Sequence, residues 1–335
     1  MTRIVSRLKS EEDVTLDNTL RPSTFGEFIG QPKIVSNLKI YIEAAKKRSE
    51  ALDHILFSGL PGLGKTTLAY LVARSLGTNI KSVAGPALEK PADLAGLLTN
   101  LKKADVLFID EIHRIPTIVE EYLYSAIEDF VLNIMIDQGP HARSVQINLA
   151  PFTLIGATTR EGLLSEPMRS RFGIFEKLGP YPDEELVEII KRSSKILGVK
   201  GDDDSFKLIA QRSRGTPRIA NRILKRIRDL AQIKSDNVIS RRIADEGLGM
   251  LGIDECGLDD TDRKILKTLI LHNGGPIGLK TIAVSIGEEE GTVEDVYEPY
   301  LIKCGFLEKT PKGRKATALA YKHLKETPPA QDNLF

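Results

Sequence analysis

The stretch Gly59-Leu60-Pro61-Gly62-Leu63-Gly64-Lys65-Thr66 decides the fold, because it fits the pattern G-x-x-x-x-G-K-[S/T] at every position. An apolar run at 54–59 predicts a buried strand before it, and a helical pattern follows at 69–76. Glycines let backbone N–H groups close around phosphate oxygens, and the helix N-terminus adds a positive dipole end. We predict a phosphate-binding loop in which Lys65 reaches the β- and γ-phosphates and Thr66 holds Mg²⁺. An ordinary glycine-proline turn is the alternative.

A second apolar run, Ala104 to Asp110, predicts another buried strand, and Glu111 follows it directly. Parallel sheets bind ligands at the carboxyl ends of their strands, so both acids are expected beside the phosphate loop. Asp110 is then placed to hold Mg²⁺, and Glu111 to polarise the attacking water as a general base. A solvated acidic turn is the alternative.

Three further residues are candidates for nucleotide contacts, and each has a simpler explanation. Thr158 follows a third apolar run at 152–157, where its hydroxyl either senses the γ-phosphate or merely ends a strand. Arg171 either stabilises charge on a transferred phosphoryl group, from a neighbouring chain, or lies on a solvated face. Arg218 follows Pro217 at a helix start and either closes over the γ-phosphate or belongs to a basic solvated helix.

The composition bounds the class of protein. Of the 335 residues 41% are hydrophobic and 28% charged, as in soluble globular proteins. The net charge is +1, so any nucleic-acid site must come from a local patch. The two cysteines, Cys256 and Cys304, are far apart, which favours free thiols in a reducing cytoplasm over a disulfide or zinc site. We expect neither a signal peptide nor a membrane span, because no apolar run approaches about 18 residues.

The chain divides into three regions by pattern. Residues 1–180 predict an α/β domain with a parallel, helix-covered sheet, because buried strands alternate with helices. Residues 181–252 are helical throughout and predict a small helical domain. Residues 253–335 predict three helices and a β-hairpin, the order of a winged helix.

The predicted wing is basic. From Lys303 to Lys325 there are seven lysines and arginines and one acid. Lys309, Lys312 and Arg314 crowd the hairpin, where basic side chains contact a phosphate backbone without choosing a sequence. A solvated basic edge is the alternative.

Together, the segments GLPGLGKT, LFIDEIHR, GATTR, SRF and GTPRIANR, in this order, resemble the AAA+ ATPases. The segments RSVQINLAPFTLIGATTR and EPYLIKCGFLEKTPKGR resemble the RuvB family in particular, and the likeness runs from Leu20 to about Arg314. It implies a RecA-like AAA+ core, a lid domain and a winged-helix head. It also implies an ATP hydrolase, in a homohexameric ring, that drives branch migration of Holliday junctions in recombination and repair.

The resemblance also assigns roles to residues. It implies that Thr158 is a sensor, that Arg171 is an arginine finger acting on the adjacent subunit's ATP, and that Arg218 is a second sensor. Lys309 and Arg314 match basic wing positions, whereas Glu290 stands where relatives often carry arginine, so no DNA contact is assigned there. The implied ATP contacts are Leu20, Arg21, Gly62, Gly64, Lys65, Thr66, Thr67, Glu128, Asp129, Phe130, Arg171, Tyr181 and Arg218.

A β-hairpin is predicted from Val131 to Leu149, with a turn at Gly139-Pro140. It either docks on RuvA, as the resemblance implies, or packs on its own domain. The implied partners are thus RuvA, RuvC, Holliday junctions and duplex DNA, with no membrane. Two alternatives remain, a replication-initiator-like switch and a clamp-loader-like ATPase. The basic wing argues against the clamp loader, and the hairpin argues against the initiator.

Overall fold

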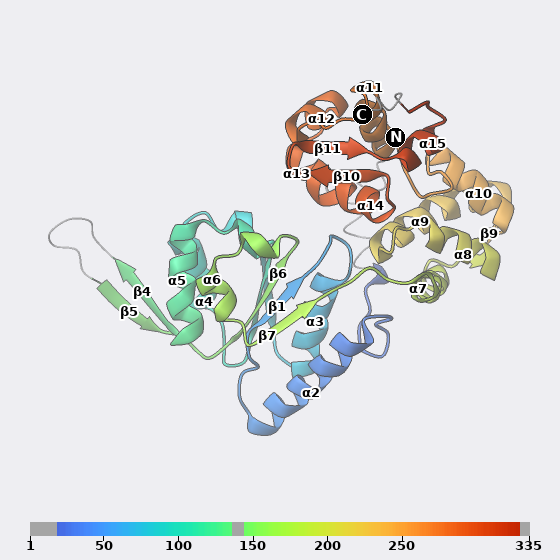
Figure 1. The fold of residues 1–335 in the computed structure, drawn as a ribbon. Coiled ribbons are helices and arrows are strands. Elements are labelled where there is room, and N and C mark those ends of the chain that lie inside the picture. Colours follow the sequence, from blue (N-terminus) through green and yellow to red (C-terminus); the bar gives the residue numbers. More distant parts are fainter. Residues whose placement is uncertain (1–18, 136–143, 329–335) are drawn as a thin grey trace. The chain divides into compact units, whose positions relative to one another are not determined.

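The computed structural model describes residues 19–135 and 144–328. The chain forms two compact units (Figure 1), one of residues 21–179 and the other of residues 1–20 and 180–335. Each unit is described by itself.

The unit of residues 21–179 is built on a five-stranded parallel sheet of order β2-β3-β6-β1-β7. The central strands β1, β3 and β6 are buried almost throughout, because helices cover both faces and their sequences are continuously apolar. The predicted parallel, helix-covered sheet is confirmed. The strands are Ile55–Ser58 (β1), Ile80–Ala84 (β2), Val106–Asp110 (β3), Thr153–Thr158 (β6) and Ile174–Lys177 (β7).

Helices cover the two faces of this sheet (Figure 1). One face carries α4, α5 and α6, whose Leu94, Leu123 and Met168 join a core cluster with Leu107 and Leu154 of the strands. The other carries α2 and α3, which contact each other. The helices are Pro32–Arg48 (α2), Lys65–Leu76 (α3), Pro91–Leu98 (α4), Thr117–Glu128 (α5) and Glu166–Ser170 (α6), with short 3-10 turns at Gly85–Ala87 (η1), Ile112–Arg114 (η2) and Glu161–Leu163 (η3).

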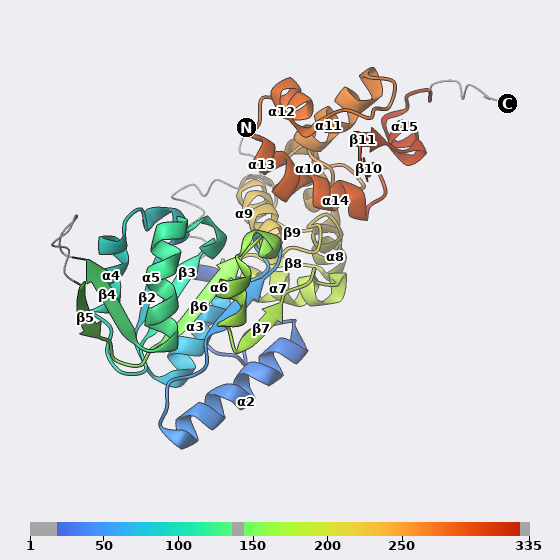
Figure 2. The ribbon, with the colours of Figure 1, turned by 60° about the vertical axis from the view of Figure 1, so that its left-hand side comes forward.

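The predicted hairpin is present and stands out from the sheet (Figure 2). Strands β4 (Val131–Met135) and β5 (Ser144–Asn148) pair antiparallel, while the predicted Gly139-Pro140 turn lies outside the described residues. Leu132 is buried in the core cluster, whereas Val145 is 40% exposed. The base of the hairpin therefore packs on its own domain, and exposed apolar surface remains on β5.

The other unit begins with a four-helix lid. Helices α7 to α10 bury Ile190, Ile209, Ile223 and Ile227 between them. Two strands of two residues each also pair in parallel here, which the uniformly helical prediction missed. The elements are Asp183–Ile196 (α7), Lys200–Gly201 (β8), Asp203–Gln211 (α8), Pro217–Lys234 (α9), Val238–Ile239 (β9) and Arg241–Met250 (α10).

The remainder of this unit has the predicted order of three helices and a hairpin. The third helix is interrupted by a π-helical turn, η4, just before Pro299, which has no N–H to donate to the turn behind it. The winged-helix prediction is confirmed. Its elements are Asp260–Leu271 (α11), Leu279–Ile286 (α12), Glu290–Thr292 (α13), Val293–Tyr297 (η4), Glu298–Lys303 (α14), Leu307–Thr310 (β10), Gly313–Ala316 (β11) and Ala318–Leu324 (α15).

Candidate functional site

The phosphate loop joins β1 to α3. Gly59 and Gly64 have φ angles of 139° and 104°, which a residue with a Cβ rarely adopts, and Gly59 also lies against the backbone of Leu178. The Lys65 ammonium is buried and donates to the carbonyls of Gly59 (2.6 Å) and Leu60 (3.0 Å). The loop thus surrounds the Lys65 ammonium and leads directly into the N-terminus of α3, as a phosphate site requires.

The two acids lie at the carboxyl edge of the same sheet. Asp110 ends β3, and its Oδ1 accepts a hydrogen bond from the backbone N–H of Glu111 (3.1 Å). Glu111 has a φ of 51°, a left-handed conformation that is uncommon for glutamate and turns the chain sharply as β3 ends. Thr66 and Thr67 lie in the first turn of α3, at this edge. A hydroxyl and a carboxylate supply the oxygen ligands that Mg²⁺ prefers, so Thr66 and Asp110 fit a magnesium site.

The side chain of Glu111 belongs to a polar network that ties β3 to β6. Thr159 Oγ1 donates to Glu111 Oε2 (3.0 Å), which also lies 3.4 Å from His113 Nδ1. The same ring nitrogen shares a hydrogen bond with Thr158 Oγ1 (2.9 Å). Thr158 is fully buried, and its hydroxyl also accepts from the backbone N–H of Arg160 (3.0 Å).

This network contains two residues that sequence reasoning did not assign. We singled out Thr158, but the hydroxyl that touches Glu111 is that of Thr159. No sequence pattern assigns a role to His113, yet its ring contacts both Glu111 and Thr158. Little in the sequence indicates which threonine contacts Glu111. Successive residues of a strand point to opposite faces, so only the register of β6 against its neighbours distinguishes Thr158 from Thr159.

Arg171 lies at the opposite edge of the sheet. It precedes β7, whose first residue Ile174 pairs with Ile55 at the start of β1, whereas the phosphate loop follows the end of β1. At about 3.3 Å per residue the four residues of β1 span roughly 13 Å, further than a side chain reaches. The Arg171 side chain therefore lies at the end of the sheet away from the phosphate loop of its own subunit.

The guanidinium of Arg171 is held in place at this edge. Its Nε and Nη2 donate to Glu128 Oε2 (3.2 and 2.7 Å), and its Nη1 donates to the carbonyl of Pro167 (2.7 Å). It also lies over the Tyr124 ring, 4.5 Å from the centroid. Asp129 and Phe130 follow Glu128 in the chain, but the Phe130 ring packs against the rings of His54 and Phe152, so only Glu128 of this predicted segment is seen to bind Arg171.

The remaining predicted nucleotide contacts lie near the chain segments that join the two units. In the first unit, the Arg21 guanidinium lies over the Tyr70 ring (4.8 Å). In the other unit Leu20 is buried, and Tyr181 donates its backbone N–H to Gly215 (2.9 Å). Arg218 lies one turn beyond, at the start of α9.

The predicted wing is formed by β10 and β11, and its basic residues differ in availability. Lys312, at the turn, is exposed. Lys309 pairs with Glu294 (3.0 Å), and the Arg314 side chain is only 12% exposed because Glu298 holds its guanidinium (2.6 Å). Lys309 and Lys312 are thus exposed, whereas Arg314 is largely covered.

None of the helices in the described part of the chain is both long and apolar enough to cross a bilayer.

Sequence comparison covers nearly the whole chain. The profile described as Holliday junction DNA helicase RuvB P-loop domain matches residues 20–178, the RuvB AAA lid domain matches 181–254, and the RuvB C-terminal winged helix domain matches 255–325. The Holliday junction branch migration complex subunit RuvB of Salinibacter ruber is 55% identical over 325 residues, which are 97% of this chain and 94% of the relative. That of Myxococcus xanthus is 54% identical over 327 residues, which are 97% and 95% of the two chains.

A solved structure agrees with these matches. The Thermotoga maritima RuvB Holliday junction branch migration motor superposes with a TM-score of 0.86 at 51% identity, over 93% of this chain and all of that one (100%). With three family profiles matched in order and relatives above half identity, the chain belongs to the RuvB family.

Proposed function

We propose that this protein is an ATP-hydrolysing ring motor that drives branch migration of Holliday junctions. The observation that carries the proposal is the position of Arg171, which lies at the sheet edge opposite its own phosphate loop. An ATP site that takes its arginine from a neighbouring copy requires a head-to-tail contact between like subunits, and such contacts form a ring when the rotation closes. The relatives, named as subunits of the branch migration complex, supply the substrate.

The chemistry follows from the groups at the carboxyl edge. The loop amides and Lys65 bind the phosphates, and Thr66 and Asp110 hold Mg²⁺. When bound, the metal ion neutralises charge on the β- and γ-phosphate oxygens. Glu111 accepts a proton from the attacking water, and Thr159 fixes the direction of its carboxylate. Thr158 senses the nucleotide from the same strand end.

The neighbouring subunit completes the site. Arg171 leaves Glu128 and approaches the γ-phosphate of the adjacent chain, with Asp129 and Phe130 at the same interface. A guanidinium that stabilises the transferred phosphoryl group is worth about 10³-fold or more in rate. The homohexamer implied by the family likeness would place one such site at each interface.

The lid and the winged helix convert hydrolysis into movement. Leu20 and Arg21 contact the adenine side, while Tyr181 and Arg218 belong to the segments that respond to the γ-phosphate. Lys312, with Lys309 and Arg314 behind it, contacts duplex phosphates without sequence choice. Branch migration breaks and remakes similar base pairs, each step worth about 1.4 kcal/mol, so ATP supplies direction and not a net change in pairing.

The partners follow from the same reasoning. The exposed face of the β4–β5 hairpin, with Val145 on it, would dock on RuvA, which holds the junction. RuvC is expected to join the same assembly. The protein is expected to act in the cytoplasm, where bacterial DNA lies.

The deciding experiment measures dissociation of a synthetic four-way junction by the protein with RuvA and ATP. We expect activity in the wild type and none in Lys65→Ala or Arg171→Ala. The two changes affect opposite ends of the strands of the sheet. Rings mixed from both variants should therefore regain ATPase activity at those interfaces where an intact phosphate loop meets an intact Arg171. A wild type that binds DNA with ATP but never dissociates the junction would contradict the motor and favour the initiator-like switch.

A further inference from the structure

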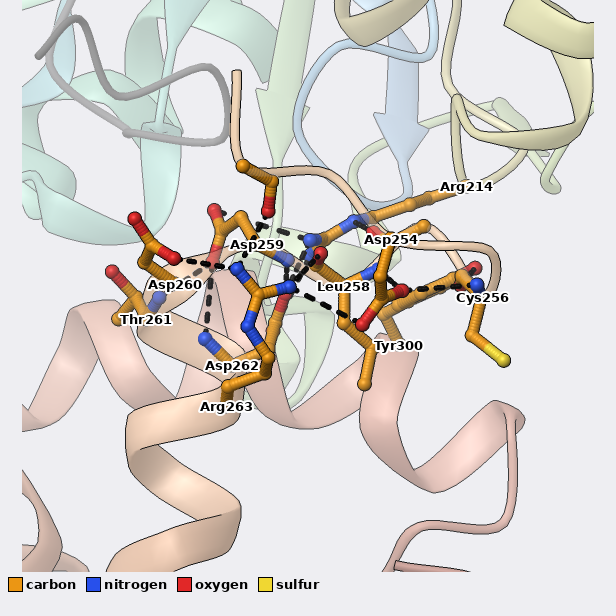
Figure 3. Close-up of polar contacts among 12 residues, drawn as sticks. Arg214, Asp254, Cys256, Leu258, Asp259, Asp260, Thr261, Asp262, Arg263 and Tyr300 are labelled. Atoms are coloured by element: carbon orange, nitrogen blue, oxygen red, sulfur yellow. Dashed lines mark hydrogen bonds and ion pairs between the residues drawn. The ribbon is translucent and has the colours of Figure 1, made fainter. Parts of the chain in front are cut away.

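Arg214 is a buried arginine in the lid whose side chain contacts Gly257, Asp262 and Tyr300 of the winged-helix segment (Figure 3). It lies in the loop between α8 and α9, four residues before Arg218, and its side chain is 4% exposed. Its Nε donates to the Gly257 carbonyl (2.9 Å), both terminal nitrogens donate to the Asp262 carboxylate, and its plane lies 4.7 Å from the Tyr300 ring centroid. One side chain of the lid is thus bound to three parts of the neighbouring domain.

The positive charge of Arg214 faces the carboxyl groups of Asp262 and Asp259. Burial lowers the pKa of Arg214, but the carboxylates of Asp262 and Asp259 outweigh this and raise it, so the guanidinium stays charged. Burial also raises the pKa of Asp262 to about 7, against the opposing effect of Arg214. Asp262 additionally accepts from the backbone N–H of Asp259 (2.8 Å) at the start of α11. Arg214 therefore contacts an acid that is itself fixed to a helix end.

The backbone around the contact is fixed as well. Arg214 has a φ of 57°, a left-handed conformation that costs a non-glycine residue free energy and directs its side chain toward α11. On the other side, the Tyr300 hydroxyl donates to the carbonyl of Cys256 (2.7 Å). The lid loop, the inter-domain segment and α14 thus converge on one guanidinium (Figure 3).

A second set of contacts holds the segment that joins the two domains. Arg263 of α11 donates to the carbonyls of Gly252 (2.7 Å) and Leu258 (2.9 Å) and pairs with Asp254 (3.2 Å). Asp254 also contacts His323 of α15 (2.9 Å). A segment held at both ends in this way does not behave as a free hinge, in contrast to the flexible linkers that usually separate domains.

We propose that Arg214 locks the winged helix to the lid, so that the two domains turn as one body when the nucleotide state changes. This inference rests on the proposed motor function. Arg214 is a positioning residue: its side chain binds Gly257, Asp262 and Tyr300, and it shares a short loop with Arg218, so a shift at the start of α9 moves the winged helix directly. Without the lock, hydrolysis would turn the lid while the wing lagged behind.

The first test compares ATP hydrolysis with junction dissociation in one reaction. Arg214→Met combined with Asp262→Leu replaces the charge pair by apolar side chains and leaves neither of those charges buried alone. We expect RuvA- and junction-stimulated hydrolysis within about 2-fold of wild type and dissociation per ATP reduced roughly 10-fold or more. The control Lys234→Gln with Glu246→Gln removes an ion pair inside the lid and should leave this ratio unchanged. If the double variant dissociated as many junctions per ATP hydrolysed as the wild type, whether or not both activities fell, the proposal would be overturned.

The second test measures the distance between the two domains directly. Labels introduced as unnatural amino acids at Lys195 of α7 and Lys267 of α11, both exposed, report the distance between lid and winged helix in the assembled protein. We expect one narrow distance distribution, identical with ADP and with a slowly hydrolysed ATP analogue, and a broad one in the double variant. A wild-type distance that changes with nucleotide would refute the lock. Failure of the wild type to dissociate junctions would instead refute the motor, and the label distances would still decide whether Arg214 holds the domains together.

Discussion

Replacing Gly85 by alanine should disturb Glu111, the proposed catalytic base, which follows the neighbouring strand. Gly85 follows β2, directly beside the end of β3, and a Cβ built on it would lie 2.5 Å from the carbonyl oxygen of Glu111 and 3.2 Å from its carbonyl carbon. The obstacle is backbone and not a flexible side chain, so it cannot rotate away. Gly85→Ala therefore has to push the backbone of Glu111 out of position.

The size of the effect follows from the contact distance. A carbon atom and a carbonyl oxygen approach to about 3.3 Å. The backbone segments at Gly85 and Glu111 must therefore move apart by roughly 0.8 Å from the 2.5 Å distance. Misplacement of a reacting group by about 1 Å costs on the order of 10²-fold in rate, which corresponds to about 2.7 kcal/mol in activation free energy. Phosphate binding depends on the loop after β1, which is separated from β3 by strand β6, so the affinity for phosphate should change little. We expect kcat to fall roughly 100-fold with nearly unchanged affinity for ATP.

Single-turnover hydrolysis and titration with a fluorescent ATP analogue measure these two quantities separately. Gly96→Ala is the matched control, since a Cβ there meets nothing within 4 Å and the residue lies inside α4. That control should hydrolyse ATP normally and gain up to about 1 kcal/mol in stability. If folded Gly85→Ala hydrolysed bound ATP at the wild-type rate, the position of Glu111 would not limit hydrolysis and its assignment as the base would fail.

Three further changes test other parts of the site. Thr159→Val removes the donor to Glu111 and should lower single-turnover hydrolysis about 10-fold while ATP still binds; an unchanged rate would show that Thr159 does not orient the base. Burial lowers the pKa of His54 below its ordinary value of 6.5, so the unfolded chain binds the proton more readily and stability, intact above pH 6.5, is lost as the pH falls. Denaturant unfolding at pH 7 and pH 5 should show a smaller loss in His54→Gln than in the wild type, and equal losses would contradict this. Lys312→Ala should weaken duplex binding and reduce the salt slope by about 0.9, whereas an unchanged slope would remove Lys312 from the phosphate contacts.

The fold was predictable where the sequence pattern is local. The strands β1, β3 and β6 are continuously apolar because both faces are covered, and each ends at a polar or glycine residue. Strands β2 and β7 were not predicted. They are the outer strands of the sheet, and sequences such as Ile80–Ala84 mix exposed and half-buried positions that do not stand out from a loop. The paired two-residue strands β8 and β9 are too short to leave a pattern.

The residues of the candidate site were likewise predictable where they lie in a local motif and not where they depend on how strands pair. Lys65, Asp110 and Glu111 were predicted because each lies within or beside a motif at a strand end, and motif order alone brings strand ends together. Thr159 and His113 depend on the register of β6 and on the left-handed turn at Glu111, which no local pattern encodes. For the same reason, the sequence could propose Arg171 as a finger but could not say which edge of the sheet it occupies.

If Arg171 is the proposed finger, its environment keeps it in a usable conformation before a ring forms. A long side chain free in solvent would lose rotamer freedom on assembly, but this one already lies over Tyr124, whose hydroxyl is hydrogen-bonded to Glu120 (2.7 Å). The hydrogen bonds that Arg171 donates to Pro167 and Glu128 then select one orientation. The Glu128 side chain is 57% exposed, so its hydrogen bond can be exchanged for one to a phosphate oxygen. The conformation of the arginine is thus fixed by its own subunit, while in the proposed ring the charge that it stabilises lies in the next subunit. This division would link ring assembly to catalysis, because each proposed ATP site needs the loop of one chain and the arginine of another.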